Sequence, residues 1–175
     1  CPSAEAFEAL ARERTGLDDF GDPARNTGLA AYVESMSTEA WPGMTGQARE
    51  VAVDYITHLL VNRLRLIADR KAHPQIAAQR ITAPLIVVGP PRSGSTLLHT
   101  LLALDPENMA PEHWVCREPS PPPGMVAPDA ERLKRADERM TGLFGLIPEI
   151  LVTHPYMIEE GCGALAESGS YILSP

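Results

Sequence analysis

The chain has 175 residues, 44% of them hydrophobic and 22% charged, which is typical of a globular protein with a sizeable core and unlike a disordered chain. Its formal net charge of −8 at pH 7 argues against nonspecific binding to nucleic acid or anionic lipid, because such surfaces need an excess of Lys and Arg. We therefore expect any anionic ligand to bind at a local site.

The cysteines indicate a cytoplasmic protein. Cys1, Cys116 and Cys162 lie far apart, and show neither C-x-x-C spacing nor the spacing of a zinc site, so we expect a reducing location and no metal. The apolar runs are too short to span a bilayer. Because the chain lacks an initiating Met and ends without tail-like composition, we expect it to be a piece of a larger protein.

The first 80 residues are predicted to be helical. Ser3 is a suitable N-cap for a helix that ends near Thr15 and Gly16, and a second helix is expected at about 28–37. Between Gln47 and His73, apolar residues recur every three or four positions, which places them on one face of a long helix that covers a core. These residues are Val53, Ile56, Leu60, Leu64 and Ile67.

The periodicity changes after residue 80. Leu85–Val88 is a continuous apolar run, which predicts a central strand of a parallel sheet that is covered on both faces. A Leu-rich helix is expected over Ser95–Leu104. The remaining elements are weaker: strands at 110–115 (or irregular chain) and 150–153, extended chain at 119–128, and helices at 129–146 and 159–171.

The segment Gly89–Thr96, GPPRSGST, connects the predicted strand to the Leu-rich helix. A tight loop in this place directs backbone N–H groups and the positive end of the helix dipole at one small volume, which favours an anion. Gly89 and Gly94 lack a β-carbon and therefore allow positive φ angles and close approach of a ligand. The loop also carries hydroxyl groups and one cation, from Ser93, Ser95, Thr96 and Arg92.

The loop differs from the Walker A pattern G-x-x-x-x-G-K-[ST] at the lysine. The spacing of Gly89 and Gly94 is retained, but Ser95 stands in the place of the lysine and the cation is Arg92. ATP and GTP hydrolysis uses that lysine against the charged β- and γ-phosphates, so this difference argues against an ordinary NTPase. An atypical P-loop nucleotide kinase or NTPase remains an alternative.

The sequence VGPPRSGSTLL resembles the 5'-phosphosulfate loop of sulfotransferases that use 3'-phosphoadenylyl sulfate. It is most similar to a bacterial family of these enzymes, which has a helical N-terminal extension and a series of motifs after the loop. The matching stretches here are LLHTLLALDP, APEHW and PSPPP, in the same order, and the close match covers about Ile81–Pro123.

This resemblance implies an α/β fold: a three-layer P-loop domain with a central parallel sheet at 81–175, preceded by the helical extension at 1–80. It also implies transfer of a sulfuryl group to a hydroxyl or amine of a small molecule, glycan or lipid, with no metal and no nucleic-acid partner. Arg92 would neutralise charge at the 5'-phosphate and the bridging oxygen. The implied donor-binding residues are Pro91, Arg92, Ser93, Gly94, Ser95 and Thr96.

The general base is less certain than the loop. Sulfotransferases use a His or a Glu for this step, and His113 is our first candidate, followed by Glu112 and by a residue outside this chain. The nearest family often has an acidic residue after the tryptophan of its A-P-x-x-W segment, but Val115 occupies that position here. Trp114 fits either the wall of an acceptor pocket or simple packing.

The pattern that holds the donor's 3'-phosphate in this family, an R-x-P followed by a Ser, is missing from the sequence. No Arg follows Arg139. The chain therefore carries half of a donor site, and we expect these residues alone to show weak or no transferase activity. A non-catalytic nucleotide-binding module is the third hypothesis, and the acceptor and the oligomeric state are not encoded in any motif.

Overall fold

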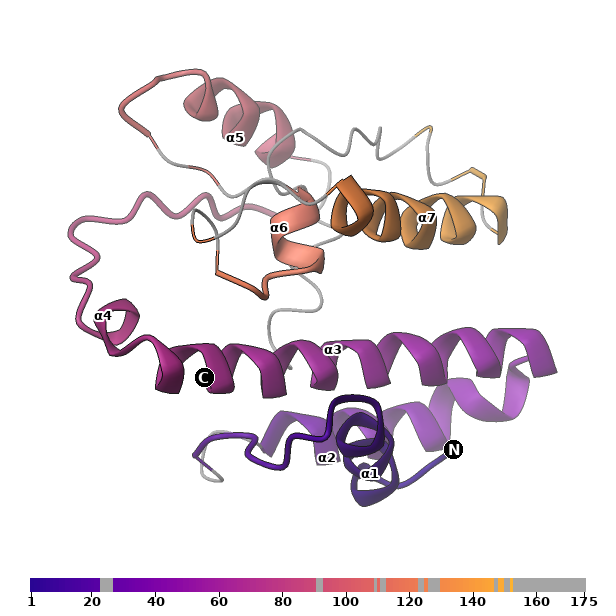
Figure 1. Cartoon of the computed structure of the whole chain (residues 1–175). Helices are drawn as coiled ribbons and strands as arrows, with labels where there is room; N and C mark the ends of the chain where they lie inside the picture. The colour runs from indigo at the N-terminus through magenta and orange to yellow at the C-terminus, as the bar shows by residue number, and fades with distance from the viewer. Residues whose placement is uncertain are drawn as a thin grey trace. The chain divides into compact units, whose positions relative to one another are not determined.

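The computed structural model describes residues 1–22, 27–90, 93–108, 110, 113–122, 125, 130–146, 148–149 and 152. These residues form helices joined by turns and irregular segments, and none of them belongs to a β strand (Figure 1). They divide into two compact units, one formed by Cys1–Ala77 and the other lying within Ala78–Ser168. None of the described helices is both long and apolar enough to cross a membrane.

Helix α1, Ala4–Thr15, begins and ends at the predicted residues. The Ser3 hydroxyl accepts a hydrogen bond from the Ala6 N–H at 3.2 Å, which satisfies one of the free donors of the first turn. Gly16 ends the helix with a φ of +68°, and its N–H donates to the Arg12 carbonyl at 2.8 Å. Both ends of the helix are therefore set by local chemistry.

Two further helical segments precede the longest helix. Helix α2, Thr27–Ser35, confirms the helix predicted at 28–37 and continues as a π-helical turn, η2, at Met36–Ala40. A 3-10 turn, η3, follows at Trp41–Gly43. The Arg49 guanidinium lies 5.3 Å from the centre of the Trp41 ring and donates to the Trp41 carbonyl at 3.0 Å, so this turn is held to the next helix.

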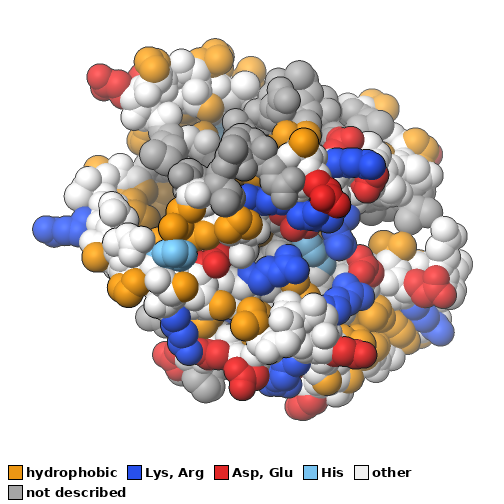
Figure 2. All heavy atoms as spheres, in the orientation of Figure 1, with side chains coloured by type: hydrophobic (Ala, Val, Ile, Leu, Met, Phe, Trp, Pro, Cys, Tyr) orange, Lys and Arg blue, Asp and Glu red, His pale blue; other side chains and the backbone are white. Residues whose placement is uncertain are grey.

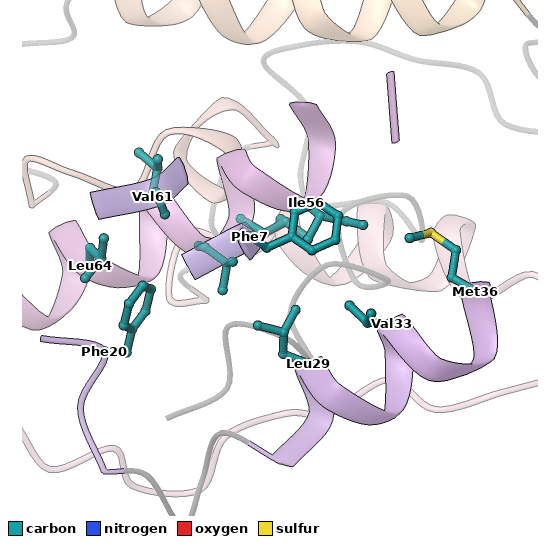
Figure 3. Packing of buried hydrophobic residues seen from close by; sticks show 11 residues of the cluster. Phe7, Phe20, Leu29, Val33, Met36, Ile56, Val61 and Leu64 are labelled. Atoms are coloured by element: carbon teal, nitrogen blue, oxygen red, sulfur yellow. The ribbon is translucent and has the colours of Figure 1, made fainter. Parts of the chain in front are cut away.

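Helix α3, Gly46–Ala72, confirms the predicted long helix, and the short helix α4, Pro74–Ala77, follows it. The apolar core of this unit forms between α3, α1 and the α2–η2 segment (Figure 3). Its buried members are Phe7, Ala11, Phe20, Leu29, Val33, Met36, Ile56, Leu59, Leu60, Val61 and Leu64. The expected role of α3 in covering a core is therefore confirmed.

Polar groups are also buried in the middle of α3. The Arg63 side chain is buried, and its Nε donates to the Phe20 carbonyl at 2.7 Å. Burial lowers the pKa of Arg63, because the charged guanidinium loses hydration. Asn62 and His58, one turn apart, form a buried hydrogen bond of 3.2 Å between Nδ2 and Nε2. The contact of Arg63 ties the loop after α1 to the long helix.

The second unit contains helices α5 (Ser95–Ala103), α6 (His113–Arg117) and α7 (Ala130–Leu146), with α6 packed on α7. Helices α5 and α7 confirm the predictions. A strand is one of the two options predicted at 110–115, and it is wrong from residue 113 onward, where α6 forms. The reason is that the periodicity of a short apolar run does not distinguish a helix from a strand. The helix expected at 159–171 lies outside the described residues, as does nearly all of the strand expected at 150–153.

The predicted α/β fold with a central parallel sheet is wrong for the described chain. Leu85–Val88 is irregular rather than a strand, and Leu85, Ile86 and Val88 are 69%, 76% and 86% exposed. A strand needs neighbouring strands to pair its backbone N–H and C=O groups, and none of the described residues provides one. The apolar run also lacks the cover on two faces that a central strand requires.

Candidate functional site

The loop that precedes α5 is described at Gly89, Pro90 and from Ser93 onward, whereas Pro91 and Arg92 lie outside the described residues. The Ser93 N–H donates to the Pro90 carbonyl at 3.2 Å, which closes a tight turn. The Ser93 side chain is exposed. The turn places Ser93 beside Gly89, the first residue of the GPPRSGST motif.

Gly89 is required for space. A β-carbon at this position would lie 2.5 Å from the Ser93 hydroxyl oxygen, closer than β-carbons approach other atoms in proteins, and 3.6 Å from the Ser93 β-carbon. A larger residue at 89 would therefore require the exposed Ser93 hydroxyl to rotate away. The close approach of a ligand at this glycine stays a prediction.

Gly94 is required for its backbone conformation. Its φ of +85° and ψ of 15° lie in the left-handed region, which glycine adopts without steric cost. The Gly94 carbonyl accepts from the Leu98 N–H at 3.0 Å and so begins helix α5. Because glycine has no side chain, this helix has no capping hydrogen bond at its first turn.

The first turn of α5 is suited to an anion. The N–H groups of residues 95–97 have no acceptor within the helix, since the acceptors of a helix begin at its N-cap. The Ser95 side chain is half-buried and that of Thr96 is exposed, so two hydroxyl groups stand at the same helix end. The helix dipole adds partial positive charge there.

Acidic and basic side chains are interspersed over the face in Figure 2. In the part of the chain that the structure describes, no group of three or more His, Cys, Asp or Glu side chains is close enough to hold a metal ion. The sequence places the loop's own cation at Arg92.

The two base candidates are only partly described. Glu112 lies outside the described residues, and His113 begins α6, with its side chain outside the described part. The next residue, Trp114, is 7% exposed and packs under the guanidinium of Arg132, whose central carbon is 5.1 Å from the ring centre. Of the two alternatives for Trp114, the wall of an acceptor pocket or simple packing, the described contacts show packing.

Arg132 is the residue that the sequence analysis missed. Every fourth residue of α7 from this arginine onward is buried, which forms the row Arg132, Ala136, Met140 and Phe144. The sequence did contain a signal for its burial: Arg132 has the four-residue spacing of the apolar row, and such a position on a helix faces the interior. The unexpected burial of this charge is the starting point of the further inference below.

Comparisons with known proteins identify the second unit. Residues 84–144 match the model of the sulfotransferase family. The whole chain resembles the crystal structure of the sulfotransferase STF1 of Mycobacterium tuberculosis, with a TM-score of 0.69 at 23% identity, over 98% of this chain and 47% of that one. The sulfotransferase STF9 of Mycobacterium avium matches with a TM-score of 0.67 at 28% identity, over 98% of this chain and 44% of that one.

These matches confirm the resemblance to sulfotransferases, and residues 84–144 carry the match to the family model. The matched segment contains the whole Gly89–Thr96 loop, α6 and nearly all of α7. None of the curated proteins matches the chain. The chain spans about half the length of the two solved sulfotransferases that it resembles.

Proposed function

We propose that this chain supplies the part of a sulfotransferase that holds the 5'-phosphosulfate end of 3'-phosphoadenylyl sulfate. The observation that carries the proposal is the Gly89–Thr96 loop, which leads through a left-handed glycine into the uncapped first turn of α5. A single anionic group fits at such a helix end without a metal. The position of this loop within the segment that matches the family supports the same function.

The reaction is the transfer of a sulfuryl group to a hydroxyl or amine. The acceptor atom attacks the sulfur, a new bond to sulfur forms, and the bond between sulfur and the bridging oxygen breaks. Adenosine 3',5'-bisphosphate leaves with that electron pair, and the acceptor's proton passes to a base. Arg92 is assigned to the charge that develops on the bridging oxygen. Ser93, Gly94, Ser95 and Thr96 are assigned to the 5'-phosphate, through their hydroxyl groups and the N–H groups that the first turn of α5 leaves without an acceptor.

The base assignment follows the order given by the sequence. His113, at the start of α6, is the first candidate, because a histidine takes up a proton near neutral pH. Glu112 is the second. The acceptor is a small-molecule, glycan or lipid alcohol or amine, and 2-naphthol is a suitable first probe because it keeps its proton at neutral pH.

Arg92→Ala tests the donor site. We expect adenosine 3',5'-bisphosphate to raise the melting temperature of the full-length protein without magnesium, and the substitution to remove most of that increase. A lost charge-assisted contact costs on the order of 2–3 kcal/mol of binding free energy. Arg80→Ala, which removes an exposed arginine outside the loop, is the matched control and should leave the increase unchanged.

Two outcomes would replace this proposal. An increase in melting temperature seen only with ATP and magnesium would favour an atypical nucleotide kinase or NTPase, which the glycine spacing of the loop also permits. Binding of the bisphosphate without sulfation of any alcohol in a screen by mass spectrometry would favour a non-catalytic binding module. Sulfated product that disappears with Arg92→Ala would exclude both.

Gly89→Ala and Ser93→Ala form a double-mutant cycle within the loop. An alanine at 89 displaces the Ser93 hydroxyl, whereas in the double variant the new methyl meets only a β-carbon at 3.6 Å, an ordinary contact. We therefore expect each single change to weaken binding of the bisphosphate by about 1 kcal/mol and the double change to weaken it no further. Additive losses in titration calorimetry would show that Gly89→Ala acts on the backbone instead.

A further inference from the structure

Arg132 is a buried cation on α7. Arg132 is 3% exposed and is the first residue of the buried row that continues with Ala136, Met140 and Phe144. Removing a guanidinium from water is costly unless hydrogen bonds and ring contacts replace its hydration. The contacts that Arg132 makes therefore decide which part of the unit it stabilises.

Among the described residues, the side-chain hydrogen bonds and the ring contact of Arg132 are to the segment 114–121. Its Nη2 donates to the Glu118 carbonyl at 2.5 Å and to the Pro121 carbonyl at 3.2 Å. Its guanidinium plane lies over the ring of Trp114, 5.1 Å from the ring centre. A planar guanidinium makes the ring contact and the two hydrogen bonds together, which the single ammonium of a lysine does not.

These contacts hold both ends of α6. Trp114 is the second residue of this helix, and Glu118 follows its last residue, with the Glu118 N–H donating to the Trp114 carbonyl at 2.8 Å. A helix of five residues is not stable by itself and depends on packing. Arg132 supplies part of that packing from α7, through its contacts with both ends of α6.

We propose that Arg132 is a positioning residue, which fixes α6 and thereby the place of His113, the first residue of this helix and the first candidate for the base. This inference rests on the proposed function. Arg132 acts through α6 and touches neither donor nor acceptor. All the residues involved lie within 84–144, the segment that matches the sulfotransferase family.

The test compares Arg132→Gln and Arg132→Lys with Arg135→Gln in the full-length protein that contains this chain. Arg135 is on the same helix, is exposed, and pairs with Glu131 at 4.0 Å, so it is a matched control. With 2-naphthol as acceptor, we expect Arg132→Gln to lower kcat at least tenfold and to leave the KM of the donor within twofold. Arg132→Lys should recover only part of the rate, and the control should keep the full rate.

Two readouts distinguish positioning of a base from general support of the fold. The wild-type rate should level off above the pKa of the base, whereas the Arg132→Gln rate should keep rising with hydroxide concentration. Added imidazole should raise the rate of Arg132→Gln severalfold and leave that of the wild type unchanged, because it replaces the misplaced base. Titration calorimetry with adenosine 3',5'-bisphosphate gives the affinity of the donor loop separately.

The outcomes that overturn the proposal are distinct. An Arg132→Gln variant with a normal rate and pH profile, or one that loses bisphosphate affinity along with rate, contradicts the positioning role. If this variant does not fold, the same readouts on Arg132→Lys decide. A full-length wild-type protein that neither binds the bisphosphate nor sulfates 2-naphthol refutes the proposed function, and the positioning role with it. If the full-length wild-type protein does both, a negative result with the Arg132 variants contradicts the positioning role alone.

Discussion

Phe7→Ala is expected to lower the free energy of unfolding of the N-terminal unit by about 3–5 kcal/mol. Phe7 is fully buried on α1, and its ring lies in the core among residues of α3 and the α2–η2 segment (Figure 3). Truncation removes apolar contacts and leaves a cavity, because the long α3 cannot collapse into the space without losing its other contacts. This loss is a large part of the stability of an ordinary domain.

Urea unfolding, followed by circular dichroism and tryptophan fluorescence, measures this change. Trp41 is packed against the same core and reports on the N-terminal unit, so its signal should move to lower urea concentration. Val51→Ala is the matched control, because this valine of α3 is 38% exposed and its truncation should cost about 0.5 kcal/mol or less. Equal losses in the two variants would contradict the packing described for α1.

The helices could be predicted because their signals are local. The beginning and end of α1 depend on the Ser3 hydroxyl and on the positive φ of Gly16, which are chemical properties of those residue types. The length of α3 follows from apolar residues repeated every three or four positions. No knowledge of distant parts of the chain is needed for either helix.

The local sequence alone could not decide whether the predicted central strand forms. Leu85–Val88 has the composition of a buried strand, but a strand exists only when other strands pair with it, and the described chain has none. For the short α6, the sequence allowed a strand or irregular chain. Its helix depends on the side chain of Arg132, which follows it by some 15 residues and which no local pattern connects to it.

The loop was the best predicted part of the site. The positive φ expected of a loop glycine is present at Gly94. Gly89 lies against the Ser93 side chain, and the approach of a ligand at this glycine stays a prediction. The assignments of Arg92 and of the base at His113 or Glu112 remain predictions. Their positions rest on resemblance to a family, whereas the glycines are fixed by backbone geometry.

Gly94→Val is expected to weaken binding of adenosine 3',5'-bisphosphate by about 3 kcal/mol, more than a hundredfold. The φ of +85° is strained for any residue with a β-carbon and most strongly for a β-branched one. The chain relieves this strain by rotating the peptide that leads into α5, which turns the N–H groups of residues 95–97 away from the anion. Binding is therefore lost because these N–H groups no longer point at the anion, although the hydroxyl groups are still present.

Gly94→Asn separates backbone strain from the presence of a side chain. Apart from the two neighbouring residues, no atom of the described residues lies within 4 Å of a β-carbon added at Gly94, so valine and asparagine meet the same described surroundings. Asparagine adopts the left-handed region more readily than other side chains, and we expect this variant to keep most of the bisphosphate affinity. If titration calorimetry gave the same loss for both variants, the side chain itself would block the ligand, and the donor would have to approach the loop directly over residue 94.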